Sequence, residues 1–300
     1  MSIFTGAGVA ICTPFTRGGQ FCTKTYSELI GWQVREGIAA IVSCGTTGES
    51  VTLSHEEHIE VVSTAVAATK AAGEKYGRKV PVVAGAGGNN TAACIAMGRE
   101  LQKVGVDALM YVTPYYNKTS QRGLVAHYSA IAAAVDLPIV IYNVPPRTAL
   151  NMTPATLSAL AKIPNIQAIK ETASDINQIA DMIALCEDDM DIFVGNDSEI
   201  LATLALGGKG VISTMANISP GKIQGIVDKF FAGEWEECRK MQLSILPMVK
   251  LLFADVNPMP VKAALRIMGY DVGECRLPLV DIEDELRVKL RAEMQRQGIL

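Results

Sequence analysis

The chain has 300 residues, 49% of them apolar and 19% charged, so it can bury a large core and is not disordered. Its 27 lysines and arginines against 31 aspartates and glutamates give a net charge of −4, which excludes a nucleic-acid binder that depends on positive charge. Apolar stretches are cut by Asp136, Pro138 or glycine well before the roughly 18 residues of a membrane span. With no export signal apparent, we expect a cytoplasmic protein that binds neither nucleic acid nor membrane.

The seven cysteines are an odd number, and none belongs to a C-x-x-C pair. This pattern argues against a disulfide framework and against a zinc site, and it favours buried, inert thiols. His55 and His58 are three residues apart without an evident third ligand, so we expect no bound metal. The glycine-rich run at residues 85–90 lacks the last glycine of a dinucleotide fingerprint, so we expect no nicotinamide cofactor either.

Eight short apolar runs alternate with longer helical patterns along the chain. The runs show little alternation of apolar and polar residues, which is typical of parallel strands buried on both faces. They span residues 8–12, 39–43, 80–84, 108–112, 139–142, 166–169, 192–194 and 210–213. The helical patterns span residues 25–35, 55–71, 91–103, 121–135, 154–161, 176–186, 199–206 and 220–231. Eight such units predict an α/β fold of the (β/α)8 TIM-barrel type rather than an open sheet.

No strand run follows residue 231. Three further helical patterns span residues 234–253, 261–268 and 282–297, with the run Asn257-Pro258-Met259-Pro260 after the first of them. No linker-like segment separates these helices from the rest of the chain. We therefore expect a catalytic barrel over residues 1–232 and a C-terminal helical region over residues 233–300 that packs on it.

Polar residues gather where the predicted strands end, which is where TIM barrels carry their active sites. Lys170 closes the sixth strand and Tyr142 closes the fifth, so the two would be neighbours. A dry surrounding favours the neutral form of an amine, which can attack a carbonyl, while a nearby phenol could move protons to and from the imine. The alternatives are a lysine that reaches solvent or pairs with Glu171, and an ordinary half-buried strand tyrosine.

Two more segments after strands offer groups that bind anions. Residues 45–49 read Gly-Thr-Thr-Gly-Glu, a turn whose hydroxyls and amides could hold a small carboxylate, or which could be a plain connection. It lacks the lysine of a phosphate-binding P-loop. Arg147 follows Pro145 and Pro146, which stiffen the loop, and its guanidinium suits a substrate carboxylate, the alternative being a surface ion pair.

Taken together, these segments resemble the dihydrodipicolinate synthase (4-hydroxy-tetrahydrodipicolinate synthase) family, within the superfamily of Schiff-base aldolases that includes N-acetylneuraminate lyase. The resemblance rests on residues 45–49, 113–117, 142–148 and 169–171 and extends in the family's order to residues 257–262. It implies a lyase that condenses pyruvate with L-aspartate 4-semialdehyde through a lysine Schiff base. The product would be 4-hydroxy-tetrahydrodipicolinate, in the first committed step of the diaminopimelate route to lysine.

The resemblance also implies a role for each matching residue. Lys170 would form the imine with pyruvate, and Tyr142 would donate and accept protons in a relay completed by Thr46 and Tyr116. Tyr116 would reach the site of a neighbouring subunit, so the resemblance implies a homotetramer built as a dimer of dimers. The substrate-binding residues would be Thr47 and Ile212 for pyruvate, Arg147 for the carboxylate of aspartate semialdehyde, and Gly195.

One departure from the family concerns regulation. Members that lysine inhibits generally carry a glutamate where this chain has Ala93. The other residues of that regulatory pocket are kept here, namely Ser50, His55, His58, Asn89 and Tyr115. Without the acid that would bind the α-amino group of lysine, we expect inhibition by lysine to be weak or absent.

The nearest alternative is a sister aldolase that acts on a sialic acid or a 2-keto-3-deoxy sugar acid. Such an enzyme would keep Lys170 and Tyr142 but would typically lack Arg147, and would often read Gly-Ser-Thr-Gly-Glu at residues 45–49. Both features favour the synthase. A non-catalytic binding barrel would have no need of Lys170, Tyr142 and Thr46 together. An oxidoreductase would be excluded if NAD did not change the melting temperature of the protein.

Overall fold

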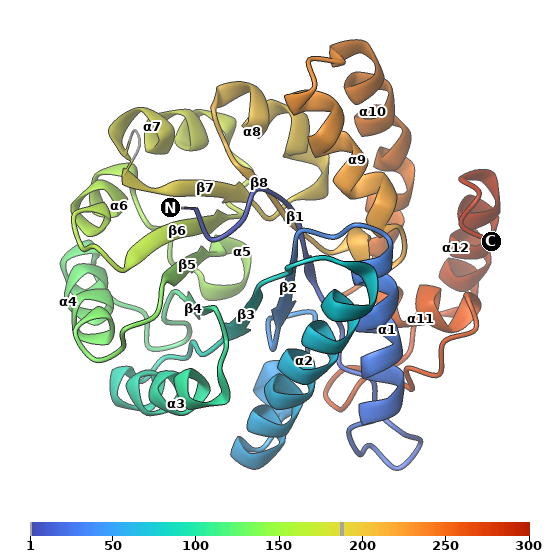
Figure 1. The fold of residues 1–300 in the computed structure, drawn as a ribbon, viewed down its shortest axis with the longest axis horizontal. Helices are drawn as coiled ribbons and strands as arrows, with labels where there is room; N and C mark the ends of the chain where they lie inside the picture. The colour runs from blue at the N-terminus through green and yellow to red at the C-terminus, as the bar shows by residue number, and fades with distance from the viewer. Residues whose placement is uncertain (1, 187–188) are drawn as a thin grey trace.

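A computed structural model describes residues 2–186 and 189–300 of the chain. Its eight strands are all parallel and form a closed barrel in sequence order, with β8 returning to β1 (Figure 1). The strands are β1 Gly6–Ala10, β2 Ala40–Ser43, β3 Val82–Gly85, β4 Ala108–Val112, β5 Ile139–Asn143, β6 Ile166–Glu171, β7 Asp191–Val194 and β8 Gly210–Ser213. The predicted (β/α)8 barrel is confirmed.

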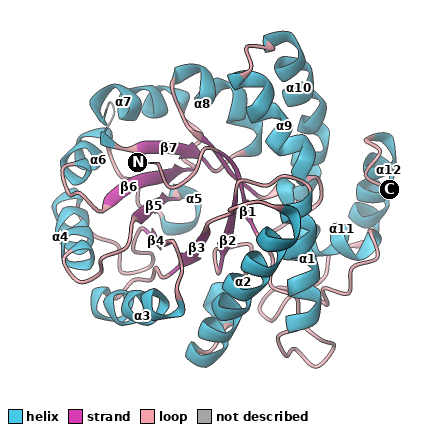
Figure 2. Ribbon diagram, in the orientation of Figure 1, coloured by secondary structure: helices cyan, strands magenta, loops and turns pink. Residues whose placement is uncertain are grey.

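Helices surround the barrel as an outer ring, with further helices on the side where the chain ends (Figure 2). They are α1 Thr23–Arg35, α2 His55–Tyr76, α3 Thr91–Val104, α4 Gln121–Ala132, α5 Pro145–Thr148, α6 Pro154–Ala161, α7 Ile176–Cys186, α8 Ile200–Leu206, α9 Pro220–Phe231, α10 Trp235–Leu252, α11 Met259–Ile267 and α12 Asp284–Arg296. No helix among the described residues combines the length and apolar character that crossing a bilayer requires.

Two of the differences from the sequence-based expectation have local reasons. The first strand covers residues 6–10 rather than 8–12. It begins earlier because Gly6 and Ala7 pair with β8, and it ends earlier because the backbone N–H of Cys12 bonds the side-chain oxygen of Asn217 instead of a neighbouring strand. The short helix α5 was not predicted. It forms because Pro145 occupies the first helical position, where a missing N–H costs nothing.

The barrel interior is a packed core that is closed at one end. Inward side chains such as Ala40, Val83 and Val140 fill it, and Phe4 of the N-terminal segment stacks on Phe193 with ring centroids 4.3 Å apart. Figure 1 shows the N-terminus lying over this end of the barrel. A second, larger apolar cluster lies between the strands and the surrounding helices. The space left for chemistry is therefore at the carboxyl ends of the strands.

The cysteines are free and mostly belong to these cores. Cys12, Cys44, Cys94, Cys186 and Cys238 are buried, while Cys22 and Cys275 are partly exposed. Burial raises the pKa of Cys12 and of Cys44 to about 12, which keeps both thiols protonated and unreactive at neutral pH.

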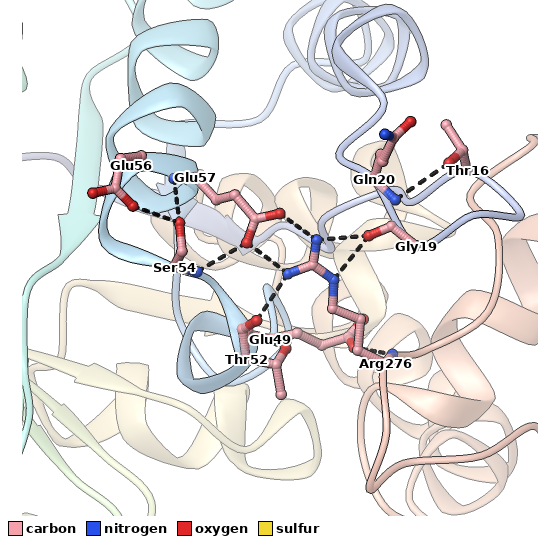
Figure 3. Close-up of polar contacts among 9 residues, drawn as sticks. All are labelled: Thr16, Gly19, Gln20, Glu49, Thr52, Ser54, Glu56, Glu57 and Arg276. Atoms are coloured by element: carbon pink, nitrogen blue, oxygen red, sulfur yellow. Dashed lines mark hydrogen bonds and ion pairs between the residues drawn. The ribbon is translucent and has the colours of Figure 1, made fainter.

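The C-terminal region is attached to the barrel through polar contacts as well as through helix packing. Helix α10 packs along α9, and the segment after α11 returns to the start of α2. There the guanidinium of Arg276 bonds Glu57 at 2.7 Å, the carbonyl of Thr52 at 2.8 Å and the carbonyl of Gly19 at 2.6 Å (Figure 3). Arg276 thus joins three separate parts of the chain. The division of the chain near residue 232 remains a prediction.

Candidate active site

Lys170 and Tyr142 occupy matched positions on adjacent strands. They are register partners across β5 and β6, so both side chains leave the sheet on the same face. The Nζ atom of Lys170 lies 4.4 Å from the centroid of the Tyr142 ring. Lys170 is 6% exposed, which places its amine at the edge of the barrel core and not in bulk water. The pair is in place for an amine and a phenol to act on one bound molecule.

Glu171 does not pair with Lys170, so the alternative interpretation of an ion pair between these two neighbours is wrong. Successive residues of a strand face opposite sides, and Glu171 points away from the barrel interior. Its carboxylate accepts hydrogen bonds from the side chain of Asn143 at 2.8 Å, the N–H of Ala173 at 2.6 Å and the side chain of Gln178 at 3.2 Å. Burial raises the pKa of Glu171, and these hydrogen bonds oppose that shift.

A buried carboxylate at the end of β7 contributes negative potential near the amine. Asp197 is fully buried and accepts hydrogen bonds from the Ser213 hydroxyl and from the N–H groups of Thr214 and Met215. Burial raises the pKa of Asp197, while these hydrogen bonds and the positive charge of Lys170 lower it. The carboxylate is fully occupied by protein donors and acts on Lys170 through its field.

Gly195 gives Lys170 its space. A side-chain carbon at this position would lie 2.6 Å from Cε of Lys170 and 2.1 Å from Cγ2 of Thr172, both closer than real atoms approach. Any larger residue would push the lysine out of its position. Glycine at this position therefore has a steric reason, and the substrate contact expected of Gly195 stays a prediction.

Contacts with the C-terminal region fix the conformation of the loop at residues 45–49. Cys44 and Glu49, at its ends, both have left-handed backbone angles, with φ of 54° and 53°. The N–H of Glu49 bonds the carbonyl of Thr46 at 3.1 Å. The buried carboxylate of Glu49 accepts a hydrogen bond from Nζ of Lys262 at 2.7 Å. It also accepts one from the backbone N–H of Arg276 at 2.9 Å (Figure 3). This buried ion pair thus anchors the loop that presents Thr46 and Thr47.

Asn257 connects two of the predicted substrate-binding residues. Its side-chain nitrogen donates to the Thr47 hydroxyl at 2.9 Å, and its backbone carbonyl accepts from the Arg147 guanidinium at 3.3 Å. Asn257 is a site residue that the sequence alone does not indicate, because these contacts join positions more than a hundred residues apart. Its only signal is its place in the run Asn257-Pro258-Met259-Pro260.

Two adjoining cavities open at the carboxyl ends of the strands. The first, which we call the rim cavity, brings together most of the predicted site residues. Its lining includes Lys170, Tyr142, Thr46, Thr47, Arg147 and Gly195. The second, the side cavity, shares Thr46, Tyr142 and Arg147 with it and extends toward Ser50 and Tyr115. An amine, a phenol, hydroxyls and a guanidinium thus surround one space.

Two of the predicted catalytic and substrate-binding residues line neither cavity. Ile212 is fully buried in the core inside the barrel. Tyr116 is 93% exposed, with a left-handed backbone at φ 67°, and a single chain does not bring it to Lys170.

The predicted regulatory residues are spread around the side cavity. Ser50 and Tyr115 line it, whereas His58 bonds the carbonyl of Gly85 at 2.8 Å. Burial lowers the pKa of His58. The remaining contacts are His55 to Glu100 at 2.9 Å and the side chain of Asn89 to the carbonyl of Tyr115 at 3.2 Å.

The chain resembles a described protein family along nearly its whole length. The model of the dihydrodipicolinate synthetase family matches residues 3–297. A 4-hydroxy-tetrahydrodipicolinate synthase of Acetivibrio thermocellus is 48% identical over 298 residues, 99% of each chain. The dihydrodipicolinate synthase structures from Thermotoga maritima (37% identity) and, with lysine bound, from Cyanidioschyzon merolae (36%) each give a TM-score of 0.95 over 100% of both chains. This chain belongs to the dihydrodipicolinate synthetase family.

Proposed function

We propose that this protein condenses pyruvate with L-aspartate 4-semialdehyde to 4-hydroxy-tetrahydrodipicolinate, the step that opens the diaminopimelate route to lysine. The observation that carries the proposal is the register-matched pair of Lys170 and Tyr142 in a cavity that also contains Arg147. The curated relative named for this activity supports the assignment over the full chain. The cytoplasmic location expected from the sequence stays a prediction.

The proposed reaction begins at the amine of Lys170. Nζ attacks the keto carbon of pyruvate and water leaves, giving an iminium that withdraws electrons from the methyl group. Tyr142 takes part in moving the proton from that methyl group, with Thr46 as the next hydroxyl of the relay. The resulting enamine carbon bonds to the aldehyde carbon of the second substrate, whose oxygen gains a proton.

Ring closure releases the enzyme. The α-amino group of the second substrate, once deprotonated, attacks the imine carbon and displaces Nζ of Lys170. One water is lost overall, and the product keeps all seven carbons of the two substrates. In this scheme Thr47 binds the pyruvate carboxylate, and Arg147 binds the carboxylate of aspartate semialdehyde.

The quaternary assembly forms part of the proposal. Tyr116 is almost fully exposed on one chain, and we propose that it completes the proton relay of a neighbouring subunit in a homotetramer. A dimer would then be the smallest unit with a complete site, because a single chain leaves Tyr116 away from its own Lys170.

The direct test is turnover of pyruvate with L-aspartate semialdehyde, coupled to reduction of the cyclic product. We expect robust turnover from the purified protein. If folded, assembled protein shows none, the proposal fails, and assays with sialic acid and 2-keto-3-deoxy sugar acids would test the sister aldolases. Arg147 favours the synthase over those aldolases, since their second substrates present hydroxyls where aspartate semialdehyde presents a carboxylate and an ammonium.

A further inference from the structure

The proposed second substrate carries two charges besides its aldehyde. At neutral pH, L-aspartate semialdehyde has a carboxylate and an ammonium group on the same carbon. In the proposed function Arg147 binds the carboxylate, but no residue is assigned to bind the ammonium. A group with negative charge near Arg147 would recognise it and would separate this substrate from aldehydes that lack the amine.

Three carboxylates near the carboxyl ends of β6 and β7 already accept hydrogen bonds from protein donors. Glu171 faces away from the barrel interior, and Asp197 is enclosed by the hydroxyl of Ser213 and two backbone N–H groups. Glu199 accepts from the side chain of Asn196 at 3.1 Å and does not line the rim cavity. These groups cannot meet a substrate ammonium without losing the bonds that hold them.

Asp255 is the one carboxylate among the described residues that line the rim cavity. It lies in the segment between α10 and α11 and is partly exposed. One carboxylate oxygen accepts from the N–H of Val256 at 2.7 Å, which orients the group. Two residues further on, the carbonyl of Asn257 accepts from Arg147. The same stretch of backbone therefore sets an anion and a cation beside one cavity, the charge arrangement that an amino-acid head group requires.

We propose that Asp255 is a specificity-determining residue that binds the α-ammonium of L-aspartate semialdehyde, opposite the carboxylate held by Arg147. The inference rests on the proposed function and adds the group that recognises the amine. In this proposal the segment between α10 and α11, and not the barrel strands, selects against aldehydes that lack the amine.

The test compares L-aspartate semialdehyde with 4-oxobutanoate, the same aldehyde without the amine, used as a competitive inhibitor. Asp255→Asn keeps the shape and the bond from Val256 but removes the charge. We expect it to raise the KM for L-aspartate semialdehyde roughly 10- to 100-fold, the usual cost of losing a hydrogen bond to a charged group. The inhibition constant of 4-oxobutanoate should stay within about twofold of the wild-type value, since this ligand has no ammonium group to interact with the charge of Asp255.

Two further variants serve as references. Arg147→Ala should weaken both ligands, because both carry the carboxylate. Asp175→Asn removes an exposed carboxylate that caps α7 outside the rim cavity, and asparagine retains the cap, so both constants should remain as in the wild type. Borohydride trapping of pyruvate by Asp255→Asn should match the wild type, which separates an effect on the second substrate from an effect on the imine.

The outcomes separate the two proposals. If the wild type does not turn over pyruvate and L-aspartate semialdehyde, the proposed function fails and this inference fails with it. A second outcome is that the wild type turns over both substrates while Asp255→Asn leaves the KM for L-aspartate semialdehyde unchanged, or weakens the binding of this substrate and of 4-oxobutanoate equally. In that case the proposed function stands and the role of Asp255 is refuted. A selective rise for the amine-bearing substrate supports it.

Discussion

Lys170 and Glu171 are adjacent in the chain and have opposite roles because a strand alternates its faces. Lys170 faces the barrel interior beside Tyr142, while Glu171 is bound among Asn143, Ala173 and Gln178 on the outer side. The amine is thereby kept from the neighbouring carboxylate, which would otherwise hold it as an ion pair. Gly195 completes the arrangement by leaving room for the lysine stem.

Replacing Lys170 tests the nucleophile directly. Lys170→Ala should abolish the mass increase that borohydride reduction with pyruvate gives in the intact protein, because no amine is left to form the imine. Tyr142→Phe should still form the imine that borohydride traps, but its turnover rate should fall by the roughly 10²- to 10⁴-fold that a general acid–base contributes. Trapping that persists in Lys170→Ala with a native circular dichroism spectrum would move the nucleophile elsewhere.

A second prediction at this scale concerns lysine as a regulator. Ala93 stands where lysine-inhibited members of the family carry the glutamate that binds the α-amino group, so we expect lysine to bind weakly or not at all. Calorimetric titration of the assembled protein with L-lysine measures this. A submicromolar dissociation constant would contradict the expectation, and a gain of affinity in Ala93→Glu would support its physical basis.

Among the elements, the start of α2 depends on two separate interactions of one side chain. Glu57 closes the capping box with Ser54, and its carboxylate also forms the ion pair with Arg276 (Figure 3). The hydrogen bond from Arg276 lowers the pKa of Glu57 from 4.5 to about 2. Because the folded-state pKa is depressed, this pair stabilises the protein above pH 4.5, and the contribution is lost as the pH falls from 4.5 toward 2.

Glu57→Gln isolates the ion pair, since glutamine can still close the capping box. We expect the variant to be less stable than the wild type at pH 7, with the difference shrinking as the pH approaches 2. Urea denaturation at pH 7, 4.5 and 3, followed by circular dichroism, gives the free energies of unfolding. A difference that stays constant over this range would show that the charge of Glu57 is irrelevant. Ser54→Ala provides the contrast: it breaks the capping box but keeps the pair of Glu57 with Arg276, so its loss of stability should not follow the titration of Glu57.

At the scale of the whole molecule, the proposed exchange of Tyr116 between subunits predicts complementation. A mixed dimer of Lys170→Ala and Tyr116→Phe chains has one site with both an intact lysine and an intact tyrosine. If the chains mix equally, half of the dimers are mixed and activity should recover to roughly a quarter of the wild-type value. Co-expression of the two chains with the same tag, so that homodimers and mixed dimers are purified together, measures it.

The matched control for this experiment uses Tyr142→Phe in place of Tyr116→Phe. Tyr142 serves the site of its own chain, so a mixed dimer with Lys170→Ala has no intact site and should gain nothing. Recovery with both partners, or with neither, would refute the exchange of Tyr116 between subunits.

The sequence by itself was sufficient for the barrel and for the polar residues that end its strands. Buried parallel strands produce unbroken apolar runs, and the polar residue that ends each run marks the open face, so Lys170 and Tyr142 could be located without coordinates. The helices α6, α7 and α9 have the predicted ends, because proline or a clear change in polarity punctuates the chain there.

Only the tertiary structure decided which distant side chains meet. The ion pair of Glu49 with Lys262 and the bonds of Asn257 to Thr47 and Arg147 join residues 110 to 213 positions apart, and no local pattern encodes such contacts. The placement of Ile212 in the barrel core, outside the lining of both cavities, and of Asp255 in the lining of the rim cavity has the same origin. Periodicity reports how a segment is buried, whereas a site depends on which segments the closed barrel and the returning C-terminal chain bring together.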